Sequence, residues 1–153
     1  QIDTDLEILF PETYINSVQE RLICYHSLNE VTNQSALDQF VYELQDRFGT
    51  LPPTSQALIQ SIQLKWLAIE LHFEKIVLKK NKLIGYFDLS TNQDFFQSGQ
   101  FQFMIKKLQS HSKKGMLKER KQGENSRLLL SFENVNTIEE ALNSLKELQP
   151  ITA

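Results

Sequence analysis

The segment TSQALIQSIQLKWLAIELHF, residues 54–73, carries two apolar stripes when it is drawn as a helix. A helix with apolar side chains on two faces must be covered on both, which is typical of a central helix in a bundle. We therefore expect residues 54–73 to form the helix at the centre of the hydrophobic core. The first stripe is Leu58, Ile62, Trp66, Ile69 and Phe73, and the second is Leu64, Leu67 and Leu71.

Two further helices are expected on the N-terminal side of this segment. The first covers about 14–31, where apolar residues recur at three- and four-residue steps. The second begins near Ser35, a good N-cap residue, and ends at Gly49, a good C-cap residue. Before them, alternating apolar residues at 6–10 end at Pro11, which favours a short edge strand. The apolar stripe of the first helix is Ile15, Val18, Leu22, Tyr25 and Leu28.

After residue 74 the hydrophobic period changes. Residues 75–80 and 83–89 are expected to be strands around an Asn81-Lys82 turn, and residues 116–121 and 127–133 to form a second hairpin around 122–125. Short helices are expected around 95–96 and at 100–109. Thr137, with Glu140 three residues later, is a capping box for a last helix.

This order of elements predicts an α+β fold, because helices come first and hairpins later instead of alternating. We expect an N-terminal helical bundle packed against a small antiparallel sheet with further helices. All of it is expected to form a single compact domain over residues 1–153. Its helical part covers about 12–74 and its mixed part about 75–150.

The composition indicates a globular protein without a membrane segment. The chain has 153 residues, 41% hydrophobic and 23% charged, and no apolar run approaches the roughly 20 residues that span a bilayer. Cys24 is the only cysteine, so an intrachain disulfide or a cysteine zinc site is excluded, and a cytoplasmic location is expected. Residue 1 is not Met, and there is no signal peptide, which suggests a fragment of a larger protein.

No cofactor is expected. The five glycines are scattered, without a P-loop or a dinucleotide fingerprint. The histidines, His26, His72 and His111, have no metal-ligand spacing.

The charge is unevenly distributed along the chain. Residues 1–74 contain 11 Asp and Glu against 3 Lys and Arg, whereas residues 75–153 contain 8 against 13. Such an asymmetry indicates either two functional faces or ordinary solvated surface.

Glu43 and Asp46 lie three residues apart on one face of the helix that ends at Gly49, as paired carboxylates of an acid–base site would. Arg47 is four residues after Glu43, a spacing that decorates exposed helices. We expect these three residues to form a solvated face or a charged docking patch, and we expect no catalysis by this chain.

The basic second half raises a nucleic-acid-binding alternative. The candidate contacts are Lys79, Lys80, Lys82, Lys113 and Lys114, at the two expected hairpins. Lys118, Arg120 and Lys121 belong to the same basic cluster near the second hairpin. Nearby phenylalanines could stack bases, although their helical spacing favours core packing. The overall pI of about 5.6 is low for a dedicated nucleic-acid domain.

Three blocks of the first half carry a family resemblance: FPETYI at 10–15, RLICY at 21–25 and ELQDRFGTLP at 43–52. In order and spacing they resemble the C-terminal domain of bacterial transcription-repair coupling factors, and ELQDRFGTLP is the most specific. The resemblance covers the first half, and beyond residue 75 only the order of elements matches.

The resemblance implies an autoinhibitory, protein-binding domain of an ATP-driven DNA translocase. Such a translocase removes stalled RNA polymerase and recruits UvrA in nucleotide excision repair. The domain is expected to pack on a UvrB-like N-terminal module of the same protein and to mask its UvrA-binding surface. The implied contact residues are Glu43, Asp46 and Arg47. RNA polymerase and DNA are expected to be reached through the parent chain, and the isolated domain is expected to be a monomer.

Overall fold

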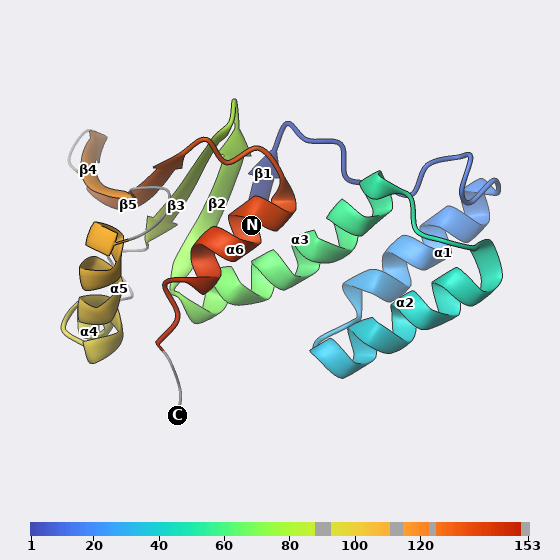
Figure 1. Cartoon of the computed structure of the whole chain (residues 1–153), viewed down its shortest axis with the longest axis horizontal. Coiled ribbons are helices and arrows are strands. Elements are labelled where there is room, and N and C mark those ends of the chain that lie inside the picture. Colours follow the sequence, from blue (N-terminus) through green and yellow to red (C-terminus); the bar gives the residue numbers. More distant parts are fainter. Residues whose placement is uncertain (88–92, 111–114, 123–124, 151–153) are drawn as a thin grey trace. The chain divides into compact units, whose positions relative to one another are not determined.

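The computed structural model describes residues 1–87, 93–110, 115–122 and 125–150. The chain divides into two units, which we call the helical unit (residues 7–63) and the sheet unit (residues 1–6 and 64–153). Helix α3 (Pro53–Glu70) belongs to both, because it continues through the boundary at Gln63 (Figure 1). The α+β class predicted from the sequence is confirmed.

The helical unit contains α1 (Val18–Asn29), α2 (Gln34–Phe48) and the first part of α3. Each of the first two helices begins at a side chain that caps it. The Ser17 hydroxyl accepts a hydrogen bond from the Glu20 amide at 3.3 Å, and Asn33 accepts one from the Ala36 amide at 2.8 Å. The N-cap of α2 is therefore Asn33 instead of Ser35, while Gly49 ends the helix as expected.

Residues 6–10 do not form the expected strand. The Leu9 amide donates to the Thr54 carbonyl at 3.2 Å, and the Leu9 carbonyl accepts from the Ser55 hydroxyl at 3.0 Å. The Phe10 amide donates to the Tyr25 hydroxyl at 2.9 Å. These bonds tie the segment to α1 and to the start of α3, so its backbone is not available for a strand ladder. The N-terminal strand is β1 (Ile2–Thr4) instead.

The sheet unit holds a mixed sheet in the order β1-β2-β3-β5-β4. Strands β2 (Phe73–Lys79), β3 (Lys82–Phe87), β4 (Met116–Gln122) and β5 (Asn125–Glu133) pair antiparallel, and β1 adds to β2 in parallel. Both expected hairpins form. The first turns at Lys80 and Asn81, one residue earlier than expected, and their φ angles of 52° and 61° suit a tight hairpin turn. In the second, residues 123 and 124 lie outside the described part.

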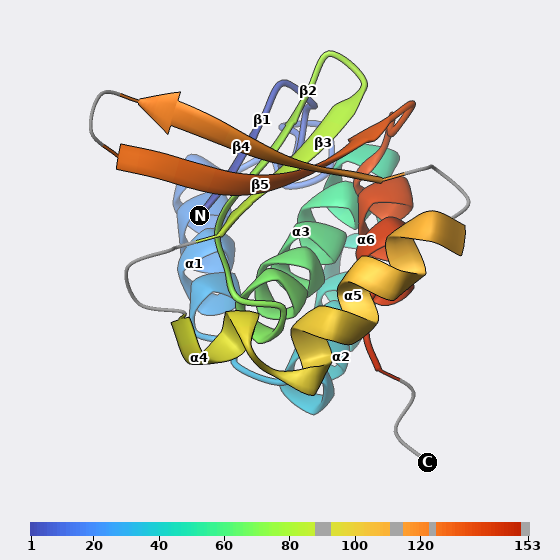
Figure 2. The same cartoon turned by 90° about the vertical axis from the view of Figure 1, so that its left-hand side faces the viewer.

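One face of the sheet is buried. Helices α5 (Gly99–Ser110) and α6 (Ile138–Lys146) lie on the same side of the sheet as the C-terminal part of α3 (Figure 2). As expected, Thr137 caps α6, accepting from the Glu140 amide at 3.0 Å. The sheet residues buried on this side are Ile76, Leu78, Leu83, Phe87, Leu130 and Phe132.

The phenylalanines near the short helix α4 (Gln93–Phe96) pack on the core. Phe87 is 1% exposed, and its ring centroid lies 5.9 Å from those of Phe95 and Phe101 and 5.7 Å from that of Phe96. This agrees with the expectation that they pack instead of stacking bases. No described helix combines the length and the apolar character needed to cross a bilayer.

Candidate protein-binding site on α1 and α2

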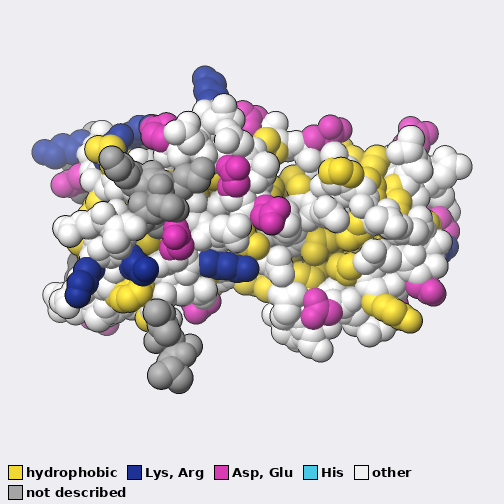
Figure 3. Space-filling view, viewed as in Figure 1, with side chains coloured by type: hydrophobic (Ala, Val, Ile, Leu, Met, Phe, Trp, Pro, Cys, Tyr) yellow, Lys and Arg dark blue, Asp and Glu magenta, His cyan; other side chains and the backbone are white. Residues whose placement is uncertain are grey.

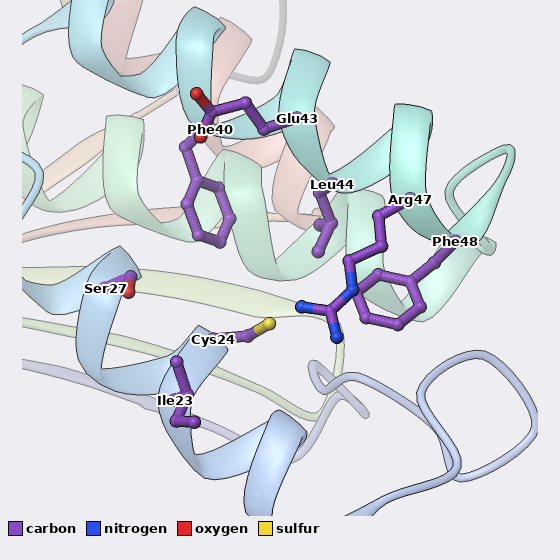
Figure 4. A pocket seen from close by; sticks show the side chains of 8 residues that line it. All are labelled: Ile23, Cys24, Ser27, Phe40, Glu43, Leu44, Arg47 and Phe48. Atoms are coloured by element: carbon purple, nitrogen blue, oxygen red, sulfur yellow. The ribbon is translucent and has the colours of Figure 1, made fainter.

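Helices α1 and α2 line an open groove of about 200 Å³. Figure 4 shows its two walls, with Phe40 and Arg47 of α2 directed toward α1 and the Cys24 sulfur directed toward α2. The groove therefore combines an apolar floor with charged groups at its rim. Its lining is Ile23, Cys24, Ser27, Phe40, Glu43, Leu44, Arg47 and Phe48.

Arg47 spans the groove. Its guanidinium forms an ion pair with Glu20 of α1 and lies 4.9 Å from the centroid of the Phe48 ring. The sequence suggested Glu43 as the i,i+4 partner, but the ion pair that Arg47 makes is with Glu20. With 61% of the Arg47 side chain exposed, the guanidinium keeps surface for a second carboxylate.

Glu43 and Asp46 complete the expected charged patch in different ways. The Glu43 carboxylate accepts a hydrogen bond from Gln39 at 3.0 Å and turns away from Arg47 (Figure 4). Asp46 is exposed and does not line the groove. No ion pair with Asp46 is found in the described part of the chain. All three residues are exposed, and their role in binding stays a prediction.

Helices α1 and α2 expose several apolar side chains, one of which, Ile23, also lines the groove. Val18, Leu22 and Ile23 are 60%, 62% and 64% exposed, and Tyr42 of α2 is 69% exposed. The prediction that Val18 and Leu22 lie on a buried stripe is wrong. The sequence did hold a signal: residues 22–25 are four consecutive apolar residues, which span most of the circumference of a helix at 100° each. One buried face cannot cover all four.

Cys24 lies in the groove wall. Burial raises the pKa of the thiol, the Arg47 guanidinium lowers it and the Glu20 carboxylate raises it again. A raised pKa makes a poor nucleophile at neutral pH. Within residues 1–87, 93–110, 115–122 and 125–150, no group of three or more His, Cys, Asp and Glu is arranged to hold a metal ion.

Two of the three lysines suspected in the first hairpin form ion pairs. Lys79 pairs with Asp3 at 2.9 Å, and Lys82 pairs with Glu133 at 3.3 Å. At Lys80 the hydrogen bond to Asp5, at 3.0 Å, comes from the backbone amide and does not involve the ammonium group. Lys113 and Lys114 lie outside the described residues. The hairpin lysines singled out from the sequence thus form no free cationic cluster among the residues that the structure describes.

Comparisons with known proteins converge on one family. The TRCF domain model matches residues 4–98, which is more than half of the chain. The transcription-repair-coupling factor of Buchnera aphidicola is 30% identical over 90 residues, 59% of this chain and 11% of that protein. The one from Haemophilus influenzae is 33% identical over 78 residues, 50% of this chain and 7% of that protein. The chain therefore spans about a tenth or less of the length of these curated relatives.

A solved structure extends the likeness to the second half. It is described as the crystal structure of the C-terminal domain of transcription-repair coupling factor and aligns with a TM-score of 0.72 at 20% identity. The alignment covers 97% of this chain and 92% of that chain. At this identity the likeness shows the fold.

Proposed function

The chain belongs to the TRCF domain family, as its sequence blocks predicted, and on that premise we propose that it is the autoinhibitory domain of a transcription-repair coupling factor. In this proposal the parent protein is an ATP-driven DNA translocase that removes stalled RNA polymerase and recruits UvrA. The present chain contributes no chemistry of its own. It packs on the UvrB-like N-terminal module of the same protein and masks the surface that UvrA would bind.

The α1–α2 groove is the observation that carries this proposal. Two of the family-implied contact residues, Glu43 and Arg47, lie in its lining. Ile23 of α1, which is 64% exposed, lines the same groove, and Val18 and Leu22 on that helix are exposed as well. Exposed apolar patches rimmed by polar residues mark protein-binding surfaces.

The charges suit a contact that has to be released. Opposed charges across an interface contribute specificity and association rate more than affinity. Arg47 is held between Glu20 and the Phe48 ring, so its guanidinium is ordered before a partner arrives, which lowers the entropy cost of binding. A clamp that opens needs a bias of only a few kcal/mol between its two states.

Calorimetric titration of the chain into the UvrB-like module of the same parent protein tests the proposal. We expect binding that weakens with added salt. The variant Glu43→Ala/Asp46→Ala/Arg47→Ala should weaken it at least tenfold, since truncating one partner of a hydrogen-bonded charge pair costs about 2 kcal/mol or more. An equal affinity of the triple variant would move the contact elsewhere on the chain.

A matched variant separates a local effect from a change in overall charge. Glu139→Ala/Glu140→Ala/Lys146→Ala removes the same charges from α6 in the sheet unit and should leave the affinity unchanged. Circular dichroism of both variants checks the fold. In the parent protein, the variant Glu43→Ala/Asp46→Ala/Arg47→Ala should also bind UvrA more tightly than the wild type. Unchanged UvrA affinity together with lost module binding would refute masking.

A further inference from the structure

The sheet has a second face that none of the helices of its unit covers. In an antiparallel pair, directly opposed residues project to the same face. The register therefore aligns one row across four strands, from Lys75 through Tyr86 and Leu129 to Lys118, and Arg127 with Arg120 comes next to it. We call these six residues the outer sheet face. The helices α5 and α6 pack on the opposite side (Figure 2).

The outer sheet face carries positive charge that no carboxylate among the described residues neutralises. Arg127 is paired with Glu74 at 2.5 Å. Among the described residues, by contrast, no carboxylate lies within ion-pair distance of Lys75, Lys118 or Arg120. Lys118 and Arg120 are exposed on β4, the edge strand. The face thus holds three cations beyond its internal pairs.

The pairing of Arg120 with Arg127 strengthens this reading. The two residues are directly opposed across β4 and β5, an arrangement in which like charges destabilise a sheet. Only one of the two has a carboxylate partner. An anionic ligand at Arg120 would relieve the repulsion, so the arrangement fits a ligand that brings negative charge to the edge strand.

The centre of the row is aromatic and apolar. Tyr86 is half-buried between Lys75 and Leu129 in the register, and the Arg127 guanidinium lies 6.0 Å from the centroid of its ring. Leu129, in the middle of the row, is only 2% exposed, so the surface of this row that a ligand can reach is the half-buried Tyr86 ring and the cations. An aromatic ring with cations on both sides can stack one base while phosphates contact the cations. An acidic peptide would use the cations alone.

We propose that the outer sheet face binds single-stranded nucleic acid. Lys75, Lys118 and Arg120 contact the phosphates, and a base packs on Tyr86. The site does not involve the lysines first suspected in the hairpin turn, because Lys79 and Lys82 are paired with Asp3 and Glu133. It is also independent of the α1–α2 groove, which lies in the other unit.

Fluorescence anisotropy with a labelled twelve-residue oligothymidylate tests the proposal on the whole 153-residue chain. We expect binding at low salt that falls as salt rises. The variant Lys118→Ala/Arg120→Ala should weaken it and lower the slope of log affinity against log salt by about 1.4, at roughly 0.7 per phosphate contact. Tyr86→Leu should weaken it roughly 5- to 150-fold with an unchanged slope, the range that base stacking supplies.

Lys106→Ala/Lys146→Ala is the control, since it removes two positive charges from α5 and α6 on the opposite side of the sheet and should leave binding unchanged. Circular dichroism confirms the fold of each variant. Absence of binding at low salt would overturn the proposal, and so would equal losses in the control. Binding of poly-glutamate as tight as that of the oligonucleotide, with no effect of Tyr86→Leu, would assign the face to an acidic protein instead.

Discussion

The two units expose opposite kinds of surface. The helical unit has seven Asp and Glu against two Arg, and its exposed apolar residues gather on α1. The sheet unit has 12 Asp and Glu against 14 Lys and Arg. Figure 3 shows a hydrophobic area over the helical unit, whereas most of the visible Lys and Arg side chains lie over the sheet unit. The charge asymmetry read from the sequence thus follows the structural division.

A substitution at the centre of the sheet unit's core should have the largest effect, and it tests whether the two units unfold separately. Phe87→Ala should destabilise the chain by about 3–5 kcal/mol, because a buried Phe is lost and a cavity is left. Helix α3 belongs to both units, so we expect a single shifted transition. Urea unfolding followed by both Trp66 fluorescence and circular dichroism at 222 nm measures this. Two separated transitions, with helical signal surviving the first, would mean that the helical unit folds by itself.

Gly49 lies in ELQDRFGTLP, the most specific block of the family resemblance, and its substitution tests the stability of the helical unit. Its φ of 93° and ψ of −168° lie in a region that is essentially restricted to glycine. Gly49→Ala should therefore cost about 1–3 kcal/mol in the free energy of unfolding. Gly99→Ala is the matched control, since the new methyl would meet no atom within 4 Å and no such backbone restriction applies there. A Gly49→Ala variant as stable as the wild type would contradict the assigned end of α2.

The N-caps of α2 and α6 allow the same kind of substitution to be compared in the two units. Asn33 caps α2 in the helical unit and Thr137 caps α6 in the sheet unit, each through one side-chain oxygen. Replacing either by Ala should cost about 1 kcal/mol. In Thr137→Ala the Glu140 carboxylate still accepts a hydrogen bond from the Asn136 amide, at 2.7 Å. The cost of Thr137→Ala should therefore be smaller than that of Asn33→Ala. Parallel urea titrations give both values, and a much larger cost for Thr137→Ala would show that Glu140 does not compensate.

The sequence predicted local features of both units better than their surfaces. Gly49 and Thr137 were identified as helix ends because capping depends on residues a few positions apart. The exposure of Leu22 was missed because burial depends on which neighbour covers α1. The ion pair of Arg47 was missed for the same reason, since Glu20 is 27 residues away along the chain. On the sheet, the lysines of one turn looked like a cluster, but the partners Asp3 and Glu133 come from other strands, and the row through Tyr86 exists only in the register.

Cys24 offers the finest test of the groove, because it is the only thiol and reports its own surroundings. Burial and the Glu20 carboxylate raise its pKa, and the Arg47 guanidinium lowers it. Glu20→Gln removes a negative charge and should lower the pKa, so alkylation by iodoacetamide at pH 8 becomes faster. Arg47→Ala removes a positive charge and should raise the pKa further, so alkylation becomes slower.

Because the two variants should shift the Cys24 pKa in opposite directions, they distinguish an effect of charge from a change in how accessible the thiol is. Both variants break the same Glu20–Arg47 ion pair, so a mere opening of the groove would accelerate both reactions alike. A shift of the midpoint of the pH–rate profile to lower pH in Glu20→Gln and to higher pH in Arg47→Ala would place the guanidinium beside the thiol in solution. Equal acceleration without a shift in either midpoint would mean that Arg47 is not held across the groove. The preordered guanidinium invoked for partner binding would then have to be abandoned.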